Sequence, residues 1–163
     1  MTLLEINGVS KRFGGLAALT HVSYSVNQGE ILGLIGPNGA GKTTLFNMIA
    51  CFYPPDSGRV VFEGKDLSGM KPYQVCALGI ARTFQVTKPF MNNSVLENVM
   101  VGSFVHLKKA HEARREAMEI LNFIGLAGQR DSLSSSLTIA DRKRLELGRA
   151  LATHPELLLL DEV

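Results

Sequence analysis

The sequence predicts an α/β fold, and two short stretches carry that prediction. The first is a glycine-rich loop at residues 36–43 that fits the template G-x-x-x-x-G-K-[ST] at every fixed position. An apolar run at 30–35 enters the loop as a predicted buried strand, and residues 44–50 leave it as a predicted helix. The second stretch is the apolar run at 157–160, a predicted buried strand that ends in two carboxylates. Two buried strands, a loop and a helix are the parts of an α/β core.

The glycine-rich loop predicts a binding site for a nucleoside triphosphate. Its glycines let successive backbone N–H groups turn toward an anion, in conformations that a Cβ would obstruct. Lys42 is expected to reach the terminal phosphates, the Thr43 hydroxyl to bind Mg²⁺, and the helix N-terminus to add positive partial charge. A glycine-rich turn that matches by chance is the alternative, and the strand and helix on either side argue against it. The predicted contacts are Gly36, Pro37, Asn38, Gly39, Ala40, Gly41, Lys42, Thr43 and Thr44.

The two carboxylates that follow the apolar run at 157–160 complement this loop. Such a strand can deliver Asp161 to hold Mg²⁺, usually through water, and Glu162 to polarise an attacking water. Alone, the pattern is also that of a core strand with a polar end. Together with the loop upstream, it predicts hydrolysis of the bound nucleotide.

Composition and charge exclude several other classes of protein. The chain has 163 residues, which makes one domain the first expectation, and 45 % of them are hydrophobic. A formal net charge of +2 is too small to argue for nucleic-acid binding. Cys51 and Cys76 lack metal-ligand spacing and are expected to be buried, reduced thiols in a cytoplasmic protein. No apolar run is as long as a membrane span, and residues 1–5 are not a signal peptide, so we expect any tie to a membrane to go through a partner.

Antiparallel β structure is predicted on both sides of the loop. Alternating apolar and polar residues bounded by turn residues are typical of half-buried strands. We expect such a strand at 21–26 and further strands at 3–9 and 59–63, with polar turns at 10–15 and 54–58. Residues 80–84 are predicted to return as a strand that delivers Gln85.

Helices are predicted through most of the second half. Ser94 and Glu97 have capping-box spacing, which predicts a helix from there to about residue 101. A charged helix is predicted over about 107–124, and another over 140–153, with a short helix from Pro72 to near Gly79. In the charged helix one set of residues is expected to form a solvated face rather than a binding patch: Arg114, Arg115, Glu116 and Glu119.

With these motifs placed, the whole chain resembles an ATP-binding-cassette (ABC) ATPase. Phe13 corresponds to the adenine-stacking aromatic, residues 36–44 to Walker A, and Gln85 in Arg-Thr-Phe-Gln to the Q-loop. Residues 137–141 stand in the place of the signature motif, and 161–162 in that of Walker B. More narrowly, the stretches at 11–19, 79–85 and 94–102 are similar to the ATPase subunits of branched-chain amino acid importers, the LivG/LivF group.

The resemblance implies a fold and a set of roles. The fold is a P-loop NTPase (RecA-like) core with an antiparallel β subdomain over about 1–85, a helical subdomain over about 86–150 and a Walker B strand at 157–162, together one nucleotide-binding domain over 1–163. ATP and Mg²⁺ are the implied cofactors. Lys42, Gln85 and Glu162 would be catalytic, and Thr43, Gln85 and Asp161 would hold Mg²⁺. For Phe13, a partly buried turn aromatic is the alternative to a role in stacking adenine. The signature residues that would contact the nucleotide of a second subunit are Leu137, Thr138, Ile139, Ala140 and Asp141.

The resemblance also implies partners and a place in the cell. A second ATPase subunit, identical or different, would complete two nucleotide sites. Transmembrane permease subunits, met by residues 86–93 with Phe90 and Met91, would hold the pair at the cytoplasmic face of the inner membrane. A periplasmic substrate-binding protein would act indirectly, and no nucleic acid is expected. The alternatives are a nucleotide-binding module without turnover, and the cassette of another transporter, such as one for urea or lipopolysaccharide.

The sequence departs from the family pattern in two places. The usual signature is Leu-Ser-Gly-Gly-Gln, whereas here Asp141 brings a charge that would repel phosphate unless it points away. Similar forms occur in LivG-like sequences, so we expect an altered but working motif. The chain also stops at Val163, before the family's D-loop and switch histidine, so we expect the C-terminal part of the cassette to be missing. None of the four histidines is expected to be the switch histidine, because all of them precede Walker B in the sequence: His21, His106, His111 and His154.

Overall fold

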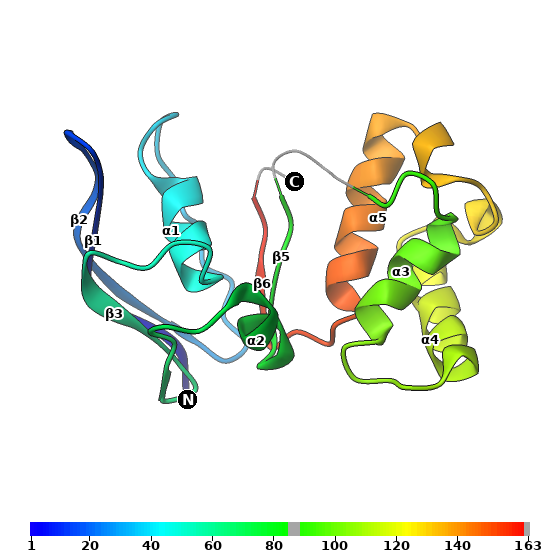
Figure 1. Cartoon of the computed structure of the whole chain (residues 1–163), viewed down its shortest axis with the longest axis horizontal. Helices are drawn as coiled ribbons and strands as arrows, with labels where there is room; N and C mark the ends of the chain where they lie inside the picture. Colours follow the sequence, from blue (N-terminus) through cyan, green and yellow to red (C-terminus); the bar gives the residue numbers. More distant parts are fainter. Residues whose placement is uncertain (85–88, 162–163) are drawn as a thin grey trace. The chain divides into compact units, whose positions relative to one another are not determined.

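The computed structural model describes residues 1–84 and 89–161, and these fall into two compact units (Figure 1). The first unit is Met1–Val75 and the second is Cys76–Val163. The boundary lies within the short helix α2 (Pro72–Ala77). The predicted short helix after Pro72 is therefore confirmed.

A four-stranded antiparallel sheet organises the first unit. It consists of β1 (Thr2–Phe13), β2 (Leu16–Asn27), β3 (Ser57–Phe62) and β4 (Lys65–Asp66), in the order β2-β1-β3-β4. The strands predicted at 3–9, 21–26 and 59–63 are confirmed. The sheet is longer than predicted because β1 and β2 pair from their outer ends to their turn.

The predicted polar turn at 10–15 is wrong in its extent. β1 continues through Phe13, which pairs with Leu16, and only Gly14 and Gly15 connect the two strands. Two-residue connections rich in glycine are favoured between antiparallel strands because they match the strand twist. Polar side chains at 10–12 suggested a loop, but cross-strand pairing keeps them in the ladder.

The hydrophobic core of the first unit lies between this sheet and α1 (Lys42–Ile49). From β1, Leu4, Ile6 and Val9 are buried, and from α1, Leu45 and Ile49 are buried. Complete burial of each such side chain contributes about 1.5–3 kcal/mol. The core therefore holds α1, the helix that begins where the glycine-rich loop ends. The predicted helix at 44–50 is confirmed, and it begins earlier, at Lys42.

The predicted buried strand at 30–35 is wrong. These residues belong to no strand, and the side chains of Ile31 and Ile35 are almost completely exposed. An apolar run predicts that a segment can be buried, but a strand also needs a partner for its backbone groups. The sheet order of the first unit gives this segment no neighbour.

Three helices form the core of the second unit: α3 (Val95–Ser103), α4 (Ala110–Phe123) and α5 (Ile139–Leu151) (Figure 1). Short 3₁₀ turns at Ala127–Gln129 and Ser134–Ser136 connect α4 to α5. Gly102 lets α3 approach α5 closely, since a Cβ there would lie 2.5 Å from the Arg149 carbonyl oxygen. The completely or almost completely buried core residues include Val95, Leu96, Val99, Ala117, Leu121, Leu126 and Leu145. The predicted helices and the capping box of Ser94 and Glu97 are confirmed.

Two short parallel strands, β5 (Ile80–Arg82) and β6 (Leu157–Leu159), complete the second unit (Figure 1). The prediction of a fully buried strand at 157–160 is wrong in part. Leu159 is buried, Leu157 and Leu158 are half-buried, and Leu160 is 44 % exposed. In a two-stranded sheet β6 has a partner on one side only, which leaves part of its apolar surface open.

Candidate nucleotide-binding site

The glycine-rich loop ends at a helix N-terminus whose cap has no side-chain hydrogen bond. Gly41 is the N-cap of α1 and adopts a left-handed conformation with φ 86°, and Gly39 has φ 84°. A Cβ at Gly41 would lie 2.4 Å from the Ala18 carbonyl oxygen, so only glycine fits there without a shift. With no side chain capping α1, its first backbone N–H groups and the positive end of the helix dipole are available to an anion.

Lys42 lies across this loop. Its Nζ donates hydrogen bonds to the carbonyl oxygens of Gly36, at 2.6 Å, and Pro37, at 2.8 Å. These two bonds hold the ammonium group over the turn that a phosphate would enter, and they fix the loop in a closed shape. Thr43 follows on the first turn of α1 with an exposed side chain.

Phe13 lies at the end of β1 beside the two-glycine turn, and its side chain is 44 % exposed. The ring of Tyr53 meets it edge to face with 5.6 Å between centroids, and the Lys11 Nζ lies 5.8 Å from its centroid. Lys11 is held in turn by Asp56 at 2.8 Å. The hydrogen bond from Lys11 is the main reason that the pKa of Asp56 lies below its usual value. An aromatic ring that is fixed by neighbours and partly exposed suits stacking on a base.

Tyr53 and Asp56, which position Phe13 and Lys11, were not identified from the sequence. They belong to the connection between α1 and β3, about forty residues beyond Phe13. Periodicity says nothing about such contacts, so no local signal would have found them.

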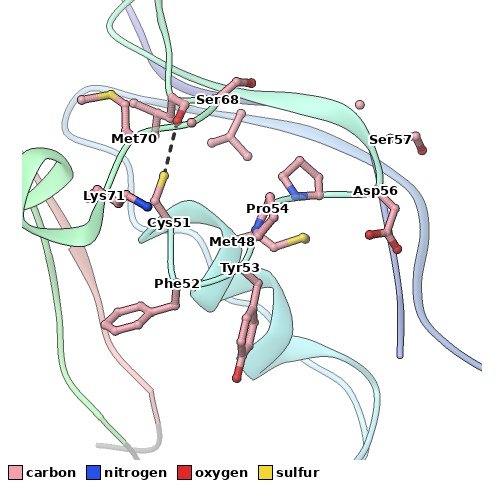
Figure 2. A pocket seen from close by; sticks show the side chains of 15 residues that line it. Met48, Cys51, Phe52, Tyr53, Pro54, Asp56, Ser57, Ser68, Met70 and Lys71 are labelled. Carbon is pink, nitrogen blue, oxygen red and sulfur yellow. Dashed lines mark hydrogen bonds between the residues drawn. The ribbon is translucent and has the colours of Figure 1, made fainter. Parts of the chain in front are cut away.

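A hollow of about 370 Å³ lies in the same unit and is separate from the loop (Figure 2). Its walls come from the C-terminal end of α1 and the segments on either side of β3, including Met48, Phe52, Pro54 and Lys71. The Sγ of Cys51 points into its wall and donates to the Leu67 carbonyl oxygen at 3.5 Å. Burial raises the pKa of this thiol. The hollow contains none of residues 36–44 and is therefore no part of the candidate phosphate site.

In the second unit, Asp161 is buried beside Arg82. The Arg82 Nη2 donates to Oδ2 of Asp161 at 2.9 Å, and the two side chains are 5 % and 6 % exposed. The backbone N–H of Asp161 donates to the Thr83 hydroxyl at 3.1 Å. The ends of β5 and β6 thus hold one carboxylate with a cation beside it. The sequence identifies Arg82 only as part of the predicted Q-loop stretch and gives no local signal of its pairing with Asp161.

Phe84, the residue before Gln85, is hydrogen-bonded to α5, the helix that follows the predicted signature motif. The backbone N–H of Phe84 donates to Oε1 of Glu146 at 2.5 Å, and Glu146 is 8 % exposed. Burial raises the pKa of Glu146, against the opposing effects of this hydrogen bond and of nearby Arg149. Gln85 and Glu162 themselves lie outside the residues that the structure describes.

The signature segment begins α5 with Thr138 as its N-cap. The Thr138 hydroxyl accepts a hydrogen bond from the Asp141 backbone N–H at 3.1 Å and donates to its carboxylate at 2.8 Å. The carboxylate also lies 3.5 Å from Arg144. The Asp141 carboxylate, the charge that distinguishes this motif from the usual signature, therefore contacts residues at the N-terminal end of its own helix, α5. Leu137 is buried, and Ile139 is 78 % exposed.

Cys51 and Cys76 are free thiols, as expected, and half-buried rather than buried. Among residues 1–84 and 89–161, no helix has the length and apolar character needed to cross a membrane.

Comparison with known proteins gives consistent results along almost the whole chain. Residues 19–163 match the family described as ABC transporter. The chain is 39 % identical over 175 residues to the high-affinity branched-chain amino acid transport ATP-binding proteins LivG of Salmonella typhimurium and Escherichia coli, covering 98 % of this chain and 69 % of each relative. It is 33 % identical to the corresponding protein BraF of Pseudomonas aeruginosa, with 98 % and 69 % covered.

Solved structures agree. A nucleotide-free ATP-binding cassette from an ABC transporter is 36 % identical with a TM-score of 0.85, covering 99 % of this chain and 69 % of that chain. A dimeric cassette in a post-hydrolysis state, bound to ADP and phosphate, is 25 % identical with a TM-score of 0.88, covering 98 % and 73 %. The predicted P-loop NTPase fold is confirmed, and the chain spans 69 % of the length of the nucleotide-free cassette.

Proposed function

The chain belongs to the ABC transporter family of ATPases, and from this premise we propose that its ATP hydrolysis powers an importer of branched-chain amino acids. One observation carries the nucleotide part of the proposal: a closed glycine-rich loop at the uncapped N-terminus of α1, with Lys42 across it. The amino acid substrate rests on the branched-chain amino acid transport for which the LivG and BraF relatives are named.

The nucleotide-binding residues follow from that loop. The backbone of residues 36–44 surrounds the phosphates, and Lys42 exchanges its two carbonyl partners for phosphate oxygens. Phe13, held by Tyr53, stacks on the adenine. The Thr138 hydroxyl and the backbone N–H groups that follow it approach the nucleotide of a second subunit, and the turned-back carboxylate of Asp141 removes much of the repulsion that its charge would cause.

Mg²⁺ is the implied metal, and the donors that the sequence motifs propose for it are the Thr43 hydroxyl, the Gln85 amide and the Asp161 carboxylate. Mg²⁺ takes hard oxygen ligands and keeps several waters, so these few oxygen donors fit it. When bound, Mg²⁺ neutralises charge on the terminal phosphates. Glu162 accepts the proton of the attacking water, Gln85 orients that water, and Lys42 stabilises the developing negative charge.

The partners in this proposal are a second ATPase subunit and transmembrane permease subunits on the cytoplasmic face of the inner membrane. A periplasmic substrate-binding protein delivers the amino acid. The dimeric ADP- and phosphate-bound relative and the transport proteins among the relatives support this assembly. Phe90 and Met91, which are 44 % and 42 % exposed, are the proposed apolar contacts with the permease.

The first experiment measures binding of a fluorescent ATP analogue to the chain. Lys42→Ala is expected to abolish binding, and Lys65→Ala, a lysine on β4 in the same unit, is the matched control. Equal binding by the parent and Lys42→Ala would refute the loop assignment.

The second experiment measures ATP turnover in the transporter reconstituted with its permease subunits. Glu162→Gln is expected to keep binding and stop hydrolysis, and removal of Mg²⁺ with a chelator to stop it as well. Stimulation of ATP turnover by leucine, isoleucine or valine supports the proposed substrate. Stimulation by urea or lipopolysaccharide alone would show that the chain belongs to a transporter for another substrate.

A further inference from the structure

Two histidines and a glutamate from three separate segments meet in the second unit. His106 follows α3, Glu116 lies in the middle of α4, and His154 lies between α5 and β6. Nε2 of His106 is 3.2 Å from Oε1 of Glu116, and Nε2 of His154 contacts the same oxygen. The two imidazole rings stack with 4.1 Å between centroids and 29° between planes. Both rings therefore aim the same nitrogen at one carboxylate.

The geometry of the three side chains suits a metal ion. One ligand atom from each residue lies within 4.8 Å of the other two. Two imidazole nitrogens and one carboxylate oxygen are ligands that Zn²⁺ prefers, and a set of three leaves a position for water. The side chain of His154 is 62 % exposed, so water and ions have access to this side of the cluster.

Glu116 is the least expected member of the cluster. The sequence placed it on a solvated helix face, but its side chain is only 15 % exposed, and that prediction is wrong. Its second oxygen, Oε2, is buried and has no hydrogen-bond partner in the part of the chain that the structure describes. A carboxylate withdrawn from water is costly unless a cation or hydrogen bonds compensate its charge. Both histidines lie on the other oxygen, so a bound cation would add the compensation that Oε2 lacks.

His154 has a left-handed backbone, a conformation in which histidine is among the more frequent non-glycine residues. Its φ is 52°, in the left-handed region where glycine and asparagine are preferred.

We propose that His106, Glu116 and His154 bind a divalent transition-metal ion, Zn²⁺ in particular. A bound ion would connect the segment after α3, helix α4 and the segment that leads into β6. The residues belong to none of the nucleotide-binding motifs, so the proposal is independent of the proposed function. A network of histidine–glutamate ion pairs that needs no metal is the competing explanation.

The test is Zn²⁺ binding by the 163-residue chain without a histidine tag, measured by calorimetry and by the visible absorption of Co²⁺ as a substitute ion. One Zn²⁺ per chain is expected. His154→Asn removes one ligand and keeps a residue that tolerates the left-handed backbone, so its fold is retained. Its affinity should fall by about 100-fold or more, since loss of even an indirect ligand contact costs about 10- to 100-fold. Glu116→Gln, which keeps the shape and removes the charge, should weaken binding similarly.

His111→Asn is the matched control, because His111 lies on the same helix as Glu116 with a side chain that is 79 % exposed. It should bind Zn²⁺ as the parent does, and Zn²⁺ should raise the melting temperature of the parent and of this control only. Parent affinity no tighter than that of His154→Asn would overturn the proposal and leave an ion-pair network. Equal loss of affinity in His111→Asn would overturn it as well, since the metal would then be binding elsewhere.

Discussion

Replacing Arg82 by methionine is expected to destabilise the second unit strongly. The Arg82–Asp161 pair is 2.9 Å long, and both side chains are about 95 % buried. At an effective dielectric constant of about 20, unit charges roughly 3 Å apart attract by about 6 kcal/mol, and desolvation of both groups offsets much of this. Removal of one partner leaves the other charged and buried, which costs about 3–5 kcal/mol. Arg82→Met should therefore lower the free energy of unfolding by that amount.

The assay is urea unfolding followed by circular dichroism, with two further variants. Arg130→Met is the matched control, because Arg130 forms a pair of 3.1 Å with Asp131 in which the side chains are 50 % and 75 % exposed. Exposed pairs contribute at most about 1 kcal/mol, so this change should be small. Arg82→Met combined with Asp161→Asn should cost less than the sum of the two single changes, because no buried charge is left without its partner. A loss below about 1 kcal/mol for Arg82→Met, or additive effects in the double variant, would refute this reasoning.

Three further predictions concern single residues. The raised pKa of Glu146 means that the folded state binds this proton more tightly than the unfolded state does. The proton therefore stabilises the fold at low pH, and this stabilisation is lost as pH rises through the pKa of the folded state. The free energy of urea unfolding of Glu146→Gln should lack this pH dependence, and a pH profile equal to that of the parent would contradict the prediction. Gly41→Ala should reduce stability and nucleotide binding more than Gly39→Ala, because both have left-handed backbones but only Gly41 lacks space for a Cβ; equal effects would show that backbone strain alone matters. Ser94→Ala should cost about 1 kcal/mol in urea unfolding, because Ser94 accepts from the Glu97 N–H in the capping box of α3, and no loss would contradict that role.

Local patterns predicted most helices and strands because a short stretch of sequence contains the signal for each of them. Ser94 and Glu97 specify a helix start three residues apart, and the alternation at 21–26 specifies a strand face. The errors occur where a partner that is distant in the sequence determines the secondary structure of a segment. Residues 30–35 have the apolar character of a strand but no partner in the sheet of their unit, and residues 10–12 have the polarity of a loop but pair with β2.

The candidate site divides along the same line. The loop at 36–44 could be predicted because its chemistry needs a fixed local order of residue types. The surroundings of Phe13 and Asp161 could not, because Tyr53 and Arg82 reach them from positions about 40 and about 80 residues away, and chain order alone does not encode that separation.

Three consecutive residues, the last of β5 and the two that follow it, contact the predicted catalytic motifs of the second unit. Arg82 pairs with Asp161, the Thr83 hydroxyl accepts from the N–H of Asp161, and the Phe84 N–H donates to Glu146 on the signature helix. Each contact spans more than sixty residues of sequence, and each partner is buried. A displacement of this segment would therefore strain the predicted Walker B carboxylate and the signature helix together. Since Gln85, the predicted Q-loop residue, comes directly after Phe84 in the sequence, we expect a displacement of residues 82–84 to act on Asp161 and on α5 through these contacts.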